Sequence, residues 1–173
     1  PLLADPDWPN KVYSGRVNEI IPCIGCHEGC INEFVEGGHP QCAVNPRTSF
    51  EYIMPHNLIP AKEKKKIGVI GAGPAGVNMA ITAAKRGHDV TLVEESGRVG
   101  GKTIPGSVPK IKYEIANYRR YLEDQVIKAQ EAENFTYLPN TTATIDWLKD
   151  QKFDSIVFAM GTKDSNLPFK GLD

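Results

Sequence analysis

The residues with the clearest chemical potential are the four cysteines, Cys23, Cys26, Cys30 and Cys42. The first three cysteines can bind one metal centre only if the backbone turns tightly between them, and nearby glycine and proline residues permit such turns. Four thiolates suit a soft metal centre, either an iron–sulfur cluster or zinc. A dense triple with a distant fourth cysteine is typical of [4Fe-4S] ligation, whereas structural zinc sites usually join two separate pairs. The spacing therefore predicts a [4Fe-4S] cluster, with zinc, disulfides or free thiols as alternatives.

The string from Cys23 to His27 also matches the attachment motif of c-type haem. A haem would leave Cys30 and Cys42 unexplained and would require an exported protein, so the cluster is the better interpretation. Because four cysteines complete such a site, we expect His27 and His39 to be solvated loop residues rather than ligands.

A second motif follows a short apolar run at 67–70 and opens a predicted helix from Pro74 to about Arg86, which Gly87 ends. Its glycines have distinct roles in a dinucleotide-binding turn: Gly71 allows the tight turn, Gly73 lets the backbone approach a pyrophosphate, and Gly76 lets helix and strand pack closely. The first helical residues, Pro74 and Ala75, lie where unpaired N–H groups face the phosphates. The alternative is a βαβ unit that uses these glycines for packing only.

The predicted strand 89–93 ends at Glu94, 23 residues after Gly71. A carboxylate there accepts hydrogen bonds from ribose hydroxyls and repels a 2′-phosphate, which favours FAD, NAD or ADP over NADP. The predicted nucleotide set beyond the fingerprint also contains Glu95, Arg98, Gly100 and Gly101. A glycine pair at this point lies along the flavin nucleotide in disulfide-reductase-like folds, so FAD is preferred. Arg98 is expected either to contact phosphate or to be exposed.

Further elements complete an α/β alternation. We predict an amphipathic helix over 113–132, a strand at 135–138, a short helix at 145–150 and a buried strand at 154–160. Gly161 and Thr162 end that strand and should face the same nucleotide, because ligands bind at the carboxyl ends of parallel strands. The predicted fold class is a partial Rossmann-like FAD/NAD(P)-binding α/β unit, preceded by an irregular iron–sulfur loop segment.

The first part of the chain has little periodicity. Residues 1–20 are predicted to be an irregular connector, 47–60 an extended covering segment, and the basic run 62–66 a solvated boundary. One helical turn is expected at 31–35 within the cysteine segment.

Composition bounds the partners and the compartment. With 173 residues, 40% of them hydrophobic, and a net charge of −1, the chain can bury a core but has no bulk charge to attract nucleic acid or a membrane surface. The lack of a bilayer-length apolar run and of a signal-peptide layout predicts a cytoplasmic protein. The absence of an initial methionine suggests a fragment or a processed piece.

Four segments together resemble one family: 2–11, which reads Leu-Leu-Ala-Asp-Pro-Asp-Trp-Pro-Asn-Lys, 42–46, 69–76 and 158–162. They are similar to 2,4-dienoyl-CoA reductase, 2-enoate reductase and trimethylamine dehydrogenase, over essentially the whole chain. The resemblance implies a TIM barrel with FMN and substrate, a [4Fe-4S] loop, and an FAD (or ADP) domain interrupted by an NAD(P)H domain. It divides this chain into 1–20 as the end of the barrel, 21–60 as the cluster and linking segment, and 61–173 as the first part of the FAD domain. The implied partners are the barrel and NAD(P)H domains, and homo-oligomerisation of the full-length protein is left open.

The function implied by the resemblance is electron transfer from NAD(P)H through FAD and the cluster to FMN, which reduces an activated C=C bond. No residue of this chain is predicted to act as acid, base or nucleophile on the substrate. Two alternatives remain: an amine dehydrogenase with structural ADP, and a non-catalytic electron-relay or zinc-stabilised module. Glutamate-synthase-like small subunits also pair clusters with a flavin fold, but the opening segment favours the barrel family.

Overall fold

A four-stranded parallel sheet is the centre of the fold in this computed structural model, which describes residues 1–162. Its strands are β1 (Lys66–Ile70), β2 (Asp89–Val93), β3 (Phe135–Leu138) and β4 (Ser155–Phe158), in the order β3-β2-β1-β4. Ile70 is in register with Val93 and with Phe158, so neighbouring strands end together. The predicted α/β class is confirmed.

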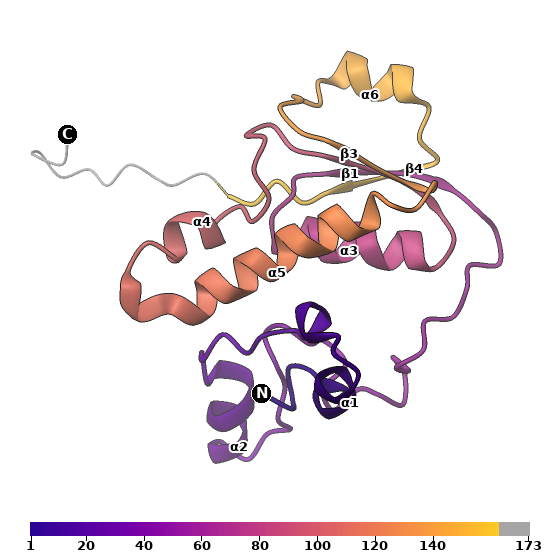
Figure 1. Ribbon diagram of the computed structural model, residues 1–173. Coiled ribbons are helices and arrows are strands. Elements are labelled where there is room, and N and C mark those ends of the chain that lie inside the picture. Colours follow the sequence, from indigo (N-terminus) through magenta and orange to yellow (C-terminus); the bar gives the residue numbers. More distant parts are fainter. Residues whose placement is uncertain (163–173) are drawn as a thin grey trace, which may run out of the picture.

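Helices cover both faces of this sheet (Figure 1). α3 (Pro74–Lys85) and α5 (Tyr113–Ala129) lie on one face and α6 (Ile145–Gln151) on the other. α3 begins with proline, whose fixed φ suits the first helical position, and Gly87, with φ of 98°, lets the chain turn back toward β2. The predicted helix, its end and the following strand are therefore confirmed.

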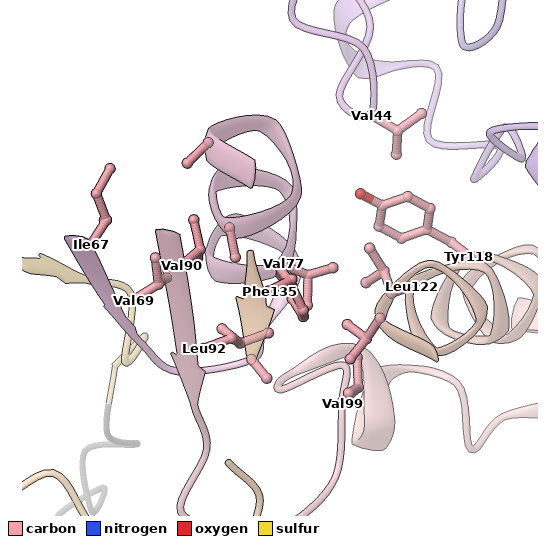
Figure 2. Packing of buried hydrophobic residues seen from close by; sticks show 14 of the residues in the cluster. Val44, Ile67, Val69, Val77, Val90, Leu92, Val99, Tyr118, Leu122 and Phe135 are labelled. Carbon is pink, nitrogen blue, oxygen red and sulfur yellow. The ribbon is translucent and has the colours of Figure 1, made fainter. Parts of the chain in front are cut away.

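The core lies between the sheet and the α3–α5 layer (Figure 2). The buried face of α5 consists of Tyr118, Leu122 and Val126, spaced four residues apart along one stripe as the sequence predicts. Val99, from the loop after β2, and Val44, from the cysteine segment, belong to the same buried cluster. α5 thus has the sheet on one side and the cysteine segment on the other.

The cysteine segment forms a separate layer beneath α5 in Figure 1. It contains η2 (Glu28–Asn32) and α2 (Glu33–Val35), so the predicted helical turn at 31–35 is present and starts earlier. The later connection includes α4 (Thr103–Gly106) and η3 (Lys110–Lys112).

The first twenty residues differ from the prediction, since they form α1 (Trp8–Tyr13) and η1 (Val17–Glu19). The buried carboxylate of Asp5 organises this segment: it pairs with the ammonium of Lys11 at 2.7 Å and accepts the N–H of Ile21 at 2.9 Å. Because polar contacts of one carboxylate stabilise this segment, its sequence contains no regular spacing of apolar residues. The sequence analysis therefore did not predict these helices.

Two other expectations are wrong. Residues 47–60 are not simply extended, because consecutive turns are closed by hydrogen bonds from Phe50 to Arg47 and from Ile53 to Phe50. β4 is not buried, since 63% of Phe158 is exposed. Within residues 1–162 β4 is an edge strand, so its apolar sequence predicted the strand but not its exposure.

No helix within residues 1–162 combines the length and apolar character needed to cross a bilayer.

Candidate functional site

The fingerprint loop lies at the carboxyl end of β1, beside the end of β4. Gly71 has φ of 104°, and a Cβ there would stand 2.5 Å from the carbonyl oxygen of Ala159. A Cβ on Gly76 would overlap the carbonyl oxygen of Gly71. Both positions therefore exclude side chains, the first to make the turn and the second to bring α3 against β1.

The second glycine pair packs directly on this loop. The N–H of Gly100 donates to the carbonyl of Ala72 at 2.8 Å, and a Cβ on Gly101 would lie 3.0 Å from the Cα of Gly73. Bare backbone from two loops thus meets at the N-terminus of α3. Such a cradle can approach a phosphate closely and present N–H groups to it.

Glu94 connects the two loops. One carboxylate oxygen accepts the N–H of Ala72 at 2.7 Å, and the other accepts the N–H and hydroxyl of Ser96 at 2.8 and 2.7 Å. Burial opposes ionisation, but these donors hold the pKa of Glu94 below its ordinary value. An ionised carboxylate is therefore fixed at the position predicted to receive ribose hydroxyls, and the oxygen that accepts only the Ala72 N–H keeps one lone pair available.

The remaining predicted nucleotide residues have fewer contacts. Pro74 is the first residue of α3 and Ala75 is exposed beside it. Glu95 is exposed, and within residues 1–162 its one hydrogen bond is a 3.4 Å contact from the hydroxyl of Thr142. The guanidinium of Arg98 is exposed and has no ion pair within residues 1–162. Thr162 is exposed at the end of the described residues. Contact of these residues with a nucleotide stays a prediction.

Arg119, which sequence reasoning gave no role, lies against Gly100. A Cβ on Gly100 would be 3.0 Å from the Cγ of Arg119, and the Nε of Arg119 is buried with no hydrogen-bond partner among residues 1–162. Its Nη1 pairs with the carboxylate of Glu123 at 2.7 Å. An unpartnered buried donor beside a glycine loop fits an anionic ligand group. No sequence signal could have identified it, because Arg119 lies off the apolar stripe of α5 like any surface arginine.

The cysteine loop wraps as the glycine content predicts. Gly25 and His27 both have positive φ, at 62° and 56°. The N–H of Gly25 donates to the sulfur of Cys23 at 3.5 Å. An N–H bond to a cysteine sulfur stabilises a thiolate, and such bonds tune iron–sulfur centres.

The fourth cysteine is brought toward the triple by a close backbone contact. The N–H of Gln41 donates to the carbonyl of Gly29, and a Cβ on Gly29 would lie 3.1 Å from the backbone of Gln41. The residues that follow these two in the chain are Cys30 and Cys42. All four cysteines are free thiols; Cys23 and Cys26 are exposed, and Cys30 and Cys42 are half-buried.

The four cysteines are the candidate ligands of the predicted metal centre. Within residues 1–162 no three His, Cys, Asp or Glu side chains converge closely enough to hold one metal ion. That finding gives no support to zinc, which needs its ligands around a single centre. A cuboidal cluster distributes its four thiolates over separate iron atoms, so it takes a wider spacing. The cluster itself stays a prediction.

A cavity of about 980 Å³ lies elsewhere, between the N-terminal segment and the distal parts of α3 and α5. Its walls include Ile21, Lys85 and Tyr121, and none of the predicted cofactor or metal residues lines it.

The comparison that decides the family concerns residues 65–173, which match the family model described as pyridine nucleotide-disulphide oxidoreductase. The chain belongs to this family. The match extends from just before β1 through the fingerprint loop and all four strands, so an oxidoreductase domain of the FAD- and NAD-binding kind is established.

Individual relatives also match the cysteine segment. A cinnamate reductase from Clostridium sporogenes is 33% identical over 100% of this chain and 25% of its own length. The solved structure of a 2-naphthoyl-CoA reductase complex aligns with a TM-score of 0.90 and 37% identity, over 99% of this chain and 25% of that one. Histamine dehydrogenase from Rhizobium sp. 4-9 aligns with a TM-score of 0.86 and 25% identity, over 96% and 24%. The chain thus spans about a quarter of the length of these relatives, and the resemblance to the 2,4-dienoyl-CoA reductase and old-yellow-enzyme-like family is confirmed.

Proposed function

We propose that this chain is the electron-relay part of an NAD(P)H-dependent ene-reductase, in which electrons pass from NAD(P)H through FAD and a [4Fe-4S] cluster to FMN, where an activated C=C bond of an enoate or enoyl-CoA is reduced. The barrel that carries FMN and the NAD(P)H domain are the proposed partners within the full-length protein. In this proposal residues 1–20 are the end of the barrel, residues 21–60 are the cluster and linking segment, and residues 61–173 are the first part of the FAD domain.

One observation carries the proposal: a four-cysteine loop and a dinucleotide cradle lie on opposite sides of the same helix. A Cβ on Gly25 would be 3.5 Å from the carboxylate of Glu114 in α5, and Gly100 contacts Arg119 of the same helix. A flavin exchanges either one or two electrons, whereas a cluster exchanges one at a time, so such a pair joins hydride chemistry to single-electron transfer.

The residues of this chain would bind and orient rather than react. Cys23, Cys26, Cys30 and Cys42 would ligate the cluster, and the Gly25 N–H would stabilise the thiolate of Cys23. The backbone at Gly71, Gly73 and Gly76 would face the pyrophosphate. In the list of further nucleotide contacts we include Pro74, Ala75, Glu94, Glu95, Arg98, Gly100, Gly101 and Thr162, and we add Arg119 for its unpartnered Nε.

A second candidate is an amine dehydrogenase in which ADP takes the place of FAD. The similarity to histamine dehydrogenase favours it. The cradle and Glu94 would bind the ADP portion of either nucleotide in the same way, so the protein's nucleotide has to be identified directly.

We would purify the full-length protein anaerobically, release its nucleotide by denaturation, identify that nucleotide by mass, and measure NADH oxidation with cinnamate as acceptor. The proposal predicts FAD and FMN, together with cinnamate-dependent NADH oxidation. ADP in place of FAD would favour the amine dehydrogenase, and the absence of any bound nucleotide would contradict both.

A further inference from the structure

The cavity between the N-terminal segment and the distal parts of α3 and α5 is a feature that the proposed function does not use. Its volume of about 980 Å³ is large enough for a small organic molecule. Part of its wall is apolar, because Ile21, Ile81 and Ala129 line it and pack against the buried core. Small-molecule sites combine such apolar walls with a few polar groups, so the polar groups of this wall decide what it can bind.

Most charged groups on the wall neutralise one another. Three ion pairs join Lys11 to Asp5, Arg16 to Asp7 and Lys128 to Glu19. Two further cations, Lys85 and Arg47, line the same cavity and have no ion pair within residues 1–162. The remaining carboxylate of the wall is that of Glu51. With His56 neutral, the wall therefore has one positive charge that no carboxylate of the wall balances.

Lys85, the last residue of α3, is the cation with the least favourable surroundings. Burial lowers the pKa of Lys85, and the charge of Lys128 lowers it further. Glu19 acts in the opposite direction, whereas Lys11 and Arg47 add to the repulsion. An anion bound beside this ammonium would compensate both its desolvation and the repulsion from its neighbours.

Tyr121 provides a third donor on the wall. Its side chain is half-buried and lines the cavity, and its hydroxyl has no hydrogen bond within residues 1–162. Burial raises the pKa of Tyr121, so the hydroxyl keeps its proton. An ammonium, a guanidinium and a hydroxyl on one partly apolar wall are all donors, and a carboxylate is an acceptor for each of them.

We propose that this cavity binds an organic monocarboxylate whose charged group pairs with Lys85 and Arg47 and whose apolar body lies against Ile21 and Ile81. The hydroxyl of Tyr121 donates to the same carboxylate. A monoanion matches the one unbalanced positive charge, whereas inorganic phosphate has no apolar part to cover the wall. The proposal does not rest on the proposed function, because no predicted cofactor or metal residue lines the cavity.

The test is isothermal titration calorimetry of the full-length protein with decanoate, with decanol and inorganic phosphate as comparison probes. We expect about one decanoate per chain with a Kd of about 100 µM or tighter, at least about tenfold weaker binding of decanol, and no competition by phosphate at equal concentration. Lys85→Met and Arg47→Met each keep an unbranched side chain without its charge and should weaken decanoate binding about tenfold. Lys149→Met is the matched control, because Lys149 is exposed on α6 and does not line the cavity.

The wild-type protein alone can overturn the proposal. An absence of saturable decanoate binding, which would also result if another segment of the full-length chain filled the cavity, contradicts it. Decanol that binds as tightly as decanoate, or phosphate that displaces decanoate, contradicts the proposed ligand chemistry. Decanoate bound at another place would be unaffected by Lys85→Met and Arg47→Met, and equal weakening in Lys149→Met would indicate a general charge effect; either result overturns the assignment to this cavity.

Discussion

At the scale of single residues, the glycines were predictable and their neighbours were not. The backbone turn of the fingerprint leaves no room for a side chain at Gly71 or Gly76. The local sequence is therefore enough to predict the roles of these two glycines. The position of Arg119 beside Gly100 depends on the approach of two segments that are separate in the chain. An arginine on a helix has many possible environments, and only the packed structure shows that this one borders Gly100.

Glu94 is predicted to stabilise the loop pair in its ionised form. Glu94→Gln replaces one acceptor oxygen with a donor that faces N–H groups, so the free energy of unfolding near pH 7 should fall by about 1–2 kcal/mol. The pKa of Glu94 is lowered in the folded state from 4.5, so its contribution is complete above pH 4.5 and is lost as the pH falls through the folded value. The difference from wild type should therefore shrink in acid.

Urea unfolding from about pH 7 down to about pH 3 measures this difference. Glu95→Gln is the matched control, because Glu95 is exposed and should change stability little at any pH. A loss of unfolding free energy in Glu94→Gln that stays the same at every pH would contradict a role for the charge of Glu94.

At the scale of secondary-structure elements, prediction worked where apolar patterning determines the fold. α3, α5 and strands β1 to β3 bury regular faces in one core, and their positions follow from periodicity. α1 was missed because the Asp5–Lys11 pair organises it, and the exposure of β4 was missed because a strand's apolar sequence does not show whether it lies at a sheet edge.

The packing of α3 on β1 should depend on Gly76. Gly76→Ala places a methyl group on the carbonyl oxygen of Gly71, which must shift the helix from the strand. We expect a loss of about 1–3 kcal/mol in the free energy of unfolding, the usual cost of overpacking, together with weaker nucleotide binding.

Gly106→Ala is the control, since its Cβ would meet only Ile115 at 3.8 Å, an ordinary contact. This control should be neutral or stabilising, because alanine is favoured over glycine in a helix. Thermal unfolding of both variants tests the prediction, and equal melting temperatures would contradict the proposed close packing.

At the scale of the whole molecule, the sequence indicated two chemical motifs but not their spatial relation. The cysteine segment lies beneath α5 and the dinucleotide cradle lies beyond it, so one helix separates the predicted centres (Figure 1). That relation arises from long-range packing of Val44 and Val99 into a shared core, for which neither motif contains a signal.

The most direct test is therefore the metal content of the anaerobically purified full-length protein, measured with its absorption spectrum. We expect about four irons and four sulfides per chain and a broad absorption near roughly 400 nm that bleaches with dithionite. The four-cysteine variant, with Cys23, Cys26, Cys30 and Cys42 all changed to serine, should lose that iron and retain its nucleotide. A colourless wild-type protein with one zinc per chain, which iron and sulfide cannot reconstitute, would contradict the electron-relay account.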